Sequence, residues 1–106
     1  MFYKKNDSGY KEKIDGVKLK TLSYGEKTSF TEVLFKKGSL IPMHSHMHEQ
    51  TGYLVKGKLR FNVAGEEYIA EIGDSWNIAG NVEHGAEALE DSVVIEVFAP
   101  VREDYL

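Results

Sequence analysis

Glycine divides the sequence into short segments, and this punctuation is the feature that most limits the possible fold. Gly25, Gly38, Gly57, Gly65 and Gly73 separate stretches in which apolar and polar residues alternate. Such alternation is typical of a half-buried strand, because successive side chains of a strand point to opposite faces. No long stretch shows a helical period. The pattern therefore predicts an all-β protein built as an antiparallel sandwich or barrel.

The alternation also predicts where the strands lie. We expect them over residues 17–24, 30–37, 51–56, 59–63, 68–72, 75–78, 83–89 and 93–98. The chain has 106 residues, which is enough for one domain with its own core. We expect a lysine-rich arm over residues 1–15, followed by a single β domain over residues 16–106.

Composition limits the possible partners and compartments. Cysteine is absent, which excludes a disulfide framework and a thiol nucleophile and fits a reducing compartment. The formal net charge is −4 and no basic stripe is present, so we expect no nucleic-acid partner. No apolar run reaches the length of a signal peptide or a membrane span. We therefore expect a cytoplasmic protein without a membrane partner.

Three of the four histidines lie close together, at His44, His46 and His48, with Gln50 just beyond. In one continuous strand these four side chains would project from the same face. Pro42 favours a strand over a helix here, because proline is tolerated at a strand start but not inside a helix. Imidazole nitrogen and amide oxygen together suit a divalent first-row transition metal. The cluster thus predicts a metal site.

The histidine cluster fits a known motif. The residues Gly38, His44, His46 and Gly57 match the pattern G-x5-H-x-H-x3-E-x6-G, and Gln50 stands where that pattern has glutamate. In this respect the chain resembles the cupin superfamily of small jelly-roll barrels.

A second segment supports the same resemblance. Gly73 and His84 match the second cupin motif, G-x5-P-x-G-x2-H-x3-N, at the expected separation from the first motif. The sequence departs from this motif at Ala79, Asn81 and Ala88. The resemblance implies a single-domain, antiparallel jelly-roll barrel, commonly found as a homodimer.

The resemblance also implies a set of metal ligands, namely His44, His46, Gln50 and His84. Two alternatives to Gln50 remain open at this point. His48 has the same strand parity as His44, and a bulge in the strand would bring in Glu49. The metal would be a divalent transition ion, with zinc, nickel, manganese, iron and copper all compatible with three nitrogens and one oxygen.

The last expected strand contains one charged residue among apolar ones. Glu96 shares a face with Val94 and Phe98. If this face is the interior, Glu96 is a desolvated carboxyl suited to proton transfer; if the strand lies at an edge, Glu96 is a solvated surface residue. Arg102 follows closely enough to fold over the barrel mouth and bind a carboxylate, or else forms a surface pair with a neighbouring acid.

The C-terminal segment sharpens the resemblance. With Gln50 and the residues around His84, it looks like the uronate-linearising cupins of pectin and alginate breakdown. That family has an acid two residues before a phenylalanine and six before an arginine, and the matching positions are Glu96, Phe98 and Arg102. The family's acid is typically aspartate, so Glu96 is longer by one methylene.

The resemblance implies a metal-dependent enzyme that opens and tautomerises 4,5-unsaturated monouronates, with Glu96, Phe98 and Arg102 as catalytic residues and a small anionic sugar acid as substrate. Two other functions fit the same features: a small-molecule-binding cupin without catalysis, and a metal-dependent dioxygenase. Outside the site, we expect Trp76 to be a core residue and Arg60 to face solvent.

Overall fold

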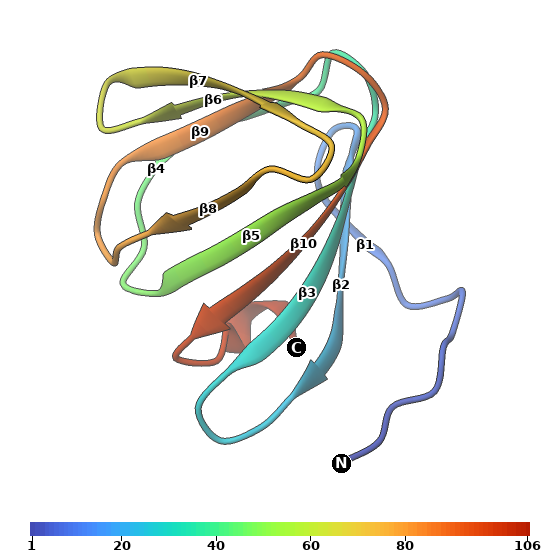
Figure 1. The fold of residues 1–106 in the computed structure, drawn as a ribbon. Helices are drawn as coiled ribbons and strands as arrows, with labels where there is room; N and C mark the ends of the chain where they lie inside the picture. Colours follow the sequence, from blue (N-terminus) through green and yellow to red (C-terminus); the bar gives the residue numbers. More distant parts are fainter.

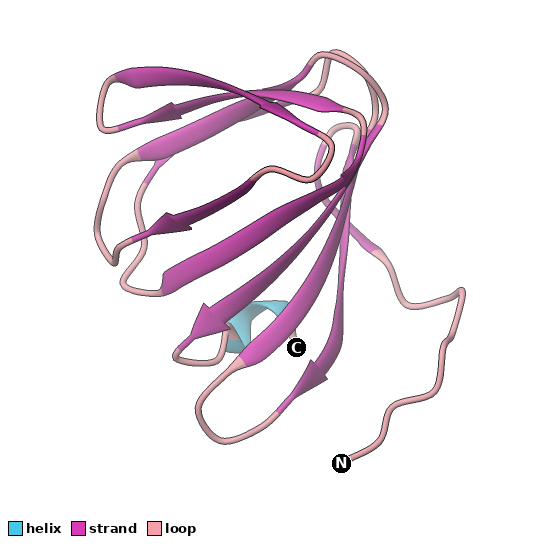
Figure 2. Ribbon diagram, in the orientation of Figure 1, coloured by secondary structure: helices cyan, strands magenta, loops and turns pink.

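Two antiparallel sheets face each other and enclose the interior, as seen in a computed structural model that describes residues 1–106 (Figure 1). The only helical segment is the 3₁₀ turn η1, Glu103–Tyr105, next to the C-terminus (Figure 2). No helix has the length and apolar character needed to cross a membrane. The architecture is the all-β jelly roll expected from the sequence.

The larger sheet has six strands in the order β1-β2-β3-β10-β5-β8. Their bounds are β1 Lys11–Ile14, β2 Val17–Tyr24, β3 Ser29–Phe35, β10 Ser92–Ala99, β5 Glu49–Lys56 and β8 Ser75–Ile78. The smaller sheet has four strands in the order β4-β9-β6-β7. Their bounds are β4 Leu40–His44, β9 His84–Ala88, β6 Lys58–Val63 and β7 Glu66–Glu71. The eight strands predicted from alternation are all present, with ends shifted by a few residues.

One structural prediction is wrong. The four positions from His44 to Gln50 do not lie on one continuous strand, because β4 ends at His44 and β5 begins only at Glu49. Residues 45–48 form a loop that carries the chain from the smaller sheet to the larger one. His46 and His48 are therefore loop residues.

The N-terminal segment contains a strand that alternation did not indicate. Within the arm expected over residues 1–15, β1 pairs with β2, so that Lys11 lies opposite Leu19. Residues 1–10 carry no strand, and Tyr3 and Tyr10 in this segment donate hydrogen bonds to Tyr24 and Glu32 of the larger sheet (Figure 1).

Along β10 the interior changes from apolar to polar, and this change locates the site. Val94 is buried and pairs with Leu54 on one side and Val33 on the other, within the apolar core. Further along the same face, Glu96 lies opposite Gly52, and Phe98 lies opposite Gln50. Apolar packing thus fills one end of the space between the sheets, and polar side chains enter it at the other end.

The smaller sheet changes in the same direction. Leu59 pairs with Ala88 in the core, whereas Val63 pairs with His84 at the other end. His84 in turn lies opposite His44 on β4. The polar ends of the two sheets therefore meet, and the histidines face the carboxyl group of Glu96 across the interior.

Candidate active site

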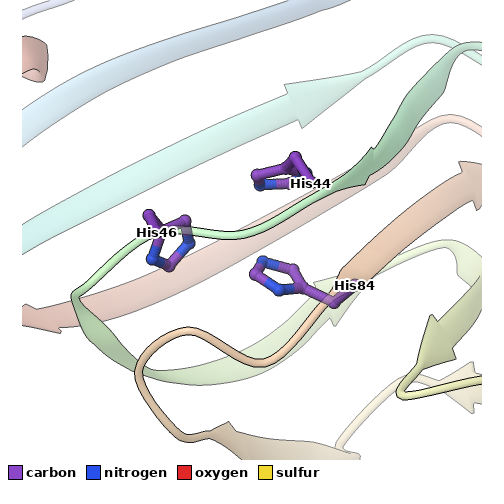
Figure 3. A group of neighbouring side chains, drawn as sticks. All are labelled: His44, His46 and His84. Atoms are coloured by element: carbon purple, nitrogen blue, oxygen red, sulfur yellow. The ribbon is translucent and has the colours of Figure 1, made fainter.

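Three imidazoles converge at the polar end of the barrel (Figure 3). His44 ends β4, His46 lies in the following loop and His84 begins β9. One nitrogen from each ring lies within 4.8 Å of the nitrogens of the other two. His84 is buried, His46 is partly buried and His44 is exposed, so the group spans from the interior to the surface.

Each of these imidazoles is oriented through its Nδ1 atom. The acceptors for His44, His46 and His84 are, in that order, the carbonyl oxygens of Pro42, His48 and Val82, at 2.9, 3.0 and 2.8 Å. A carbonyl can only accept, so we assign the proton to Nδ1 in all three rings. The Nε2 lone pairs are then free, which is the arrangement found in metal-binding histidines.

Gln50 completes this donor set. Its side chain is buried, with an exposed fraction of 5% for the residue. The amide Nε2 donates to Glu96 Oε2 at 2.5 Å, which fixes the amide so that Oε1 points to His46 Nε2, 2.8 Å away. Two lone pairs facing each other at this distance repel unless a cation lies beside both. Three imidazole nitrogens and one amide oxygen therefore fit a divalent transition metal.

Neither alternative to Gln50 joins the imidazole group. His48 is not a member of the group: its ring packs edge-on against those of His46 and Phe98, at 5.6 and 6.4 Å between centroids, and its Nδ1 has no hydrogen-bond partner. Glu49 is exposed on the outer face of the sheet, where it accepts a hydrogen bond from Asn77 at 2.9 Å. The structure thus brings Gln50 to the three histidines, and places His48 and Glu49 elsewhere.

The surroundings favour the neutral form of two of the imidazoles, His46 and His84. Burial lowers the pKa of His46 to about 4, with the positive charges of Arg102 and His84 acting in the same direction. Burial also lowers the pKa of His84. Because only a neutral imidazole can bind a metal, both shifts extend the pH range over which the site can hold one.

Glu96 faces this group from the larger sheet. It belongs to β10, which lies between β3 and β5, so the alternative of an edge strand with Glu96 in solvent is excluded. Its Oε2 accepts hydrogen bonds from Gln50 Nε2 and, at 3.3 Å, from Trp76 Nε1. Burial raises the pKa of Glu96, although both bonds and the charge of Arg102 lower it. A carboxyl group with a raised pKa is suited to general acid–base chemistry.

Arg102 is buried, with an exposed fraction of 7%. Its Nε and Nη2 donate to the carboxylate of Asp104 at 3.0 and 2.9 Å. The guanidinium lies over the rings of Phe98 and Tyr105, whose centroids are 4.8 and 3.9 Å from its central carbon. The expected pair with a neighbouring acid is therefore present, between a buried arginine and an exposed aspartate.

These side chains line a single cavity of about 250 Å³. Its polar lining includes His44, His46, Gln50, His84, Glu96 and Arg102, together with Lys13 of β1. Most of the remaining wall is apolar, and Phe98 stands between the two polar groups, edge-on to His46 at 5.9 Å and under the guanidinium of Arg102. An enclosed space with a few converging polar groups is typical of a small-molecule site.

A comparison with known protein families identifies the fold family. Residues 31–99 match the family model described as Cupin domain. The chain belongs to the cupin family. The matched residues contain both histidine segments and Glu96.

Individual proteins similar to this cupin include two that carry the name KdgF. The sequence is 32% identical to the pectin degradation protein KdgF of Dickeya dadantii, over 95% of this chain and 94% of that protein. The structure is similar to that of KdgF from a Halomonas species, with a TM-score of 0.92, 30% identity, and coverage of 100% and 98%. It is also similar to an RmlC-like cupin from Shewanella frigidimarina, with a TM-score of 0.89, 29% identity, and coverage of 94% and 90%.

Sequence reasoning about this cupin missed two residues of the site. Trp76 packs against the core as expected, but its indole also reaches Glu96. Tyr105 stacks on Arg102 from η1 and lines the cavity. One sequence feature could have indicated the role of Trp76: the residue opposite it in β5 is Gly52, which leaves room for the indole ring. Arg60, by contrast, is exposed and pairs with Glu87 at 2.9 Å, as predicted.

Proposed function

We propose that this cupin is a metal-dependent enzyme that linearises 4,5-unsaturated monouronates by ring opening and tautomerisation. One observation carries the proposal: a metal-ready donor set, a partly buried carboxyl group and a buried guanidinium line the same small cavity. The similarity to two KdgF proteins, one of them described as a pectin degradation protein, supports a uronate as the substrate.

In this proposal His44, His46, Gln50 and His84 hold a divalent transition metal. When bound, the metal supplies a Lewis acid that polarises a substrate oxygen. Gln50 matters for the charge of the site, because an amide oxygen neutralises none of the ion's charge, whereas a glutamate in its place would neutralise one unit. The donor set therefore favours an anionic substrate.

Arg102 has the right geometry to bind the substrate carboxylate. Asp104 occupies Nε and one N–H of Nη2, which leaves the Nη1 edge of the guanidinium without a partner among the side chains. The stacking rings of Phe98 and Tyr105 hold the plane of the group in place. A fixed guanidinium edge binds a carboxylate through two parallel hydrogen bonds.

Glu96 moves the proton that the reaction requires. Its carboxylate accepts the proton of the anomeric hydroxyl as the bond between the anomeric carbon and the ring oxygen breaks, and the ring oxygen becomes an enolate oxygen. The same group then delivers that proton to the neighbouring alkene carbon, and the enolate becomes a ketone. No atom is gained or lost, so one acid–base residue is sufficient for the isomerisation. Phe98 limits the position of the ring in the cavity.

The test follows the conjugated enol ether of the substrate by ultraviolet absorbance. With zinc-loaded protein, we expect the absorbance of 4,5-unsaturated galacturonate to decay faster than in buffer, and the chelated protein to lose this effect. Saturated galacturonate serves as a control for non-specific change. A decay that is no faster than in buffer, with zinc binding shown separately by calorimetry, would contradict the proposal.

A further inference from the structure

Glu96 is held in a row of three residues that crosses three strands. Across the larger sheet, Glu96 of β10 lies opposite Gly52 of β5, and Gly52 lies opposite Trp76 of β8. All three positions point to the interior face, because they alternate with outward-facing residues along their strands. Trp76 therefore lies two strands away from Glu96, about 10 Å at the usual strand spacing.

The contact between Trp76 and Glu96 depends on the missing side chain of Gly52. A Cβ atom at this position would lie 2.2 Å from Trp76 Nε1 and 2.3 Å from the adjacent ring carbon. The indole thus lies directly over the backbone of Gly52, and this brings its N–H within 3.3 Å of Glu96 Oε2. Any larger residue at position 52 would occupy the place of the ring.

The two hydrogen bonds to Glu96 are unequally distributed over its carboxyl group. Gln50 and Trp76 both donate to Oε2, and no protein group donates to Oε1. Glu96 lines the cavity, so Oε1 is the oxygen left for a substrate. A glutamate side chain has considerable rotational freedom, and two donors on one oxygen restrict it to a single orientation.

We propose that Trp76, seated over Gly52, is a positioning residue that holds Oε2 of Glu96 and so directs Oε1 to the substrate. Its role in turnover rests on the proposed function, whereas the contact itself does not. The alternative is that Trp76 serves only to pack the core, since its ring also packs on Phe61 with 4.6 Å between centroids. The two hypotheses differ in whether the indole N–H holds the carboxyl group of Glu96 in place.

The first test observes the N–H directly. Trp76 is the only tryptophan, so the zinc-loaded protein has one indole N–H resonance in a nitrogen–proton correlation spectrum. We expect Glu96→Ala to shift this resonance and to speed its exchange with solvent, because the N–H loses its acceptor. Glu87→Ala, on the outer surface of the other sheet, is the control. A resonance unmoved by Glu96→Ala overturns the proposal, whether or not the protein turns over uronates.

The second test separates positioning from packing. Trp76→Phe keeps an aromatic ring and removes the N–H, and Gly52→Ala displaces the ring. For both we expect a kcat about 10-fold to 100-fold lower, the usual effect of losing a hydrogen bond to a charged group. KM and zinc affinity should change little, since Arg102 and the histidines are untouched. Ile78→Val, a buried substitution in the same strand, controls for general loosening of the core.

The outcomes are distinct. A kcat of Trp76→Phe equal to that of Ile78→Val, at matched stability, overturns the positioning role. If the wild-type protein has no uronate turnover, the proposed function fails, and the indole resonance still decides whether Trp76 holds Glu96.

Discussion

The histidines on one side of the cavity are oriented by backbone carbonyls two residues away, whereas Glu96 on the other side is oriented by side chains 46 and 20 residues away. We call the first group, His44, His46 and His84, the histidine side. We call the second group, Glu96 with Gln50 and Trp76, the carboxyl side. The orientation of each ring on the histidine side depends on a backbone carbonyl in the same short segment. The carboxyl side exists only when β5, β8 and β10 pair in the correct register.

This difference predicts different sensitivities. Local hydrogen bonds survive small shifts between strands, so the geometry of the three histidines should tolerate changes in the larger sheet that leave Gln50 in place. The position of the carboxyl group should be sensitive to such changes, because catalysis is sensitive to misplacements of about 1 Å. Variants on the two sides should therefore separate metal binding from turnover.

The largest effect is expected on the carboxyl side. Glu96→Gln keeps the size of the side chain and removes its acid–base function. We expect turnover to fall about 10²-fold to 10⁴-fold, the usual contribution of a general acid or base, while zinc remains bound. Steady-state kinetics and calorimetry measure the two quantities, with Glu87→Gln as the control. Retained turnover would remove Glu96 from the mechanism.

The next effect concerns the histidine side. His84→Ala removes one donor, and we expect zinc affinity to fall by more than about 100-fold, because losing even an outer partner of a ligand commonly costs 10-fold to 100-fold. His48→Ala is the matched control, since His48 lies outside the imidazole group. Equal losses in the two variants would show that the ligand set is wrong.

A smaller effect is expected from Arg102, whose positive charge acts on Glu96 although the two side chains form no hydrogen bond. Arg102→Lys keeps the charge and removes the flat, two-pronged donor and its stacking on Phe98 and Tyr105. We expect KM for the unsaturated uronate to rise about 10-fold, with zinc affinity unchanged. Arg60→Lys, an exposed arginine on the other sheet, should leave KM as it is. An unchanged KM in Arg102→Lys would mean that the substrate carboxylate binds elsewhere.

The smallest effect is a pH dependence of stability in the chelated protein. Burial lowers the pKa of His46 from 6.5 to about 4, so between these values the unfolded chain binds more protons than the folded one. Stability should therefore fall as the pH is lowered through this window and level off below it. Urea unfolding should show a shallower decline for His46→Gln, since glutamine does not titrate. Parallel declines in the two proteins would contradict the lowered pKa.

Much of the fold could be predicted because the sequence alternates where a strand has one buried face. Thr31, Val33 and Phe35 are all buried, as their spacing in β3 indicates. The alternation pattern gave a wrong prediction where the backbone changes direction without a turn-forming residue. The bend over residues 45–48 contains no glycine or proline, so four equally spaced polar residues looked like one strand.

The histidine side could also be predicted, because its members belong to two short motifs. The partners of the carboxyl side could not, because its contacts join residues distant in the chain. Nothing near Trp76 in sequence shows that its ring crosses β5 to reach Glu96, and nothing near Arg102 shows that Tyr105 will stack on it. The homodimer, the cytoplasmic location and the division at residue 15 stay predictions; sedimentation measures the first.

The carbonyl partners of the three Nδ1 atoms have one consequence for how the protein acquires its ion. The imidazoles are already in the metal-binding tautomer, so loading requires no change of ring orientation. Uptake can then follow folding, and the bound ion exchanges with its surroundings. Three nitrogens and one neutral oxygen discriminate little among late first-row ions beyond their general order of affinity. We therefore expect the ion found in the purified protein to vary with the metal content of the growth medium, so that the medium, more than the fold, decides which metal is present.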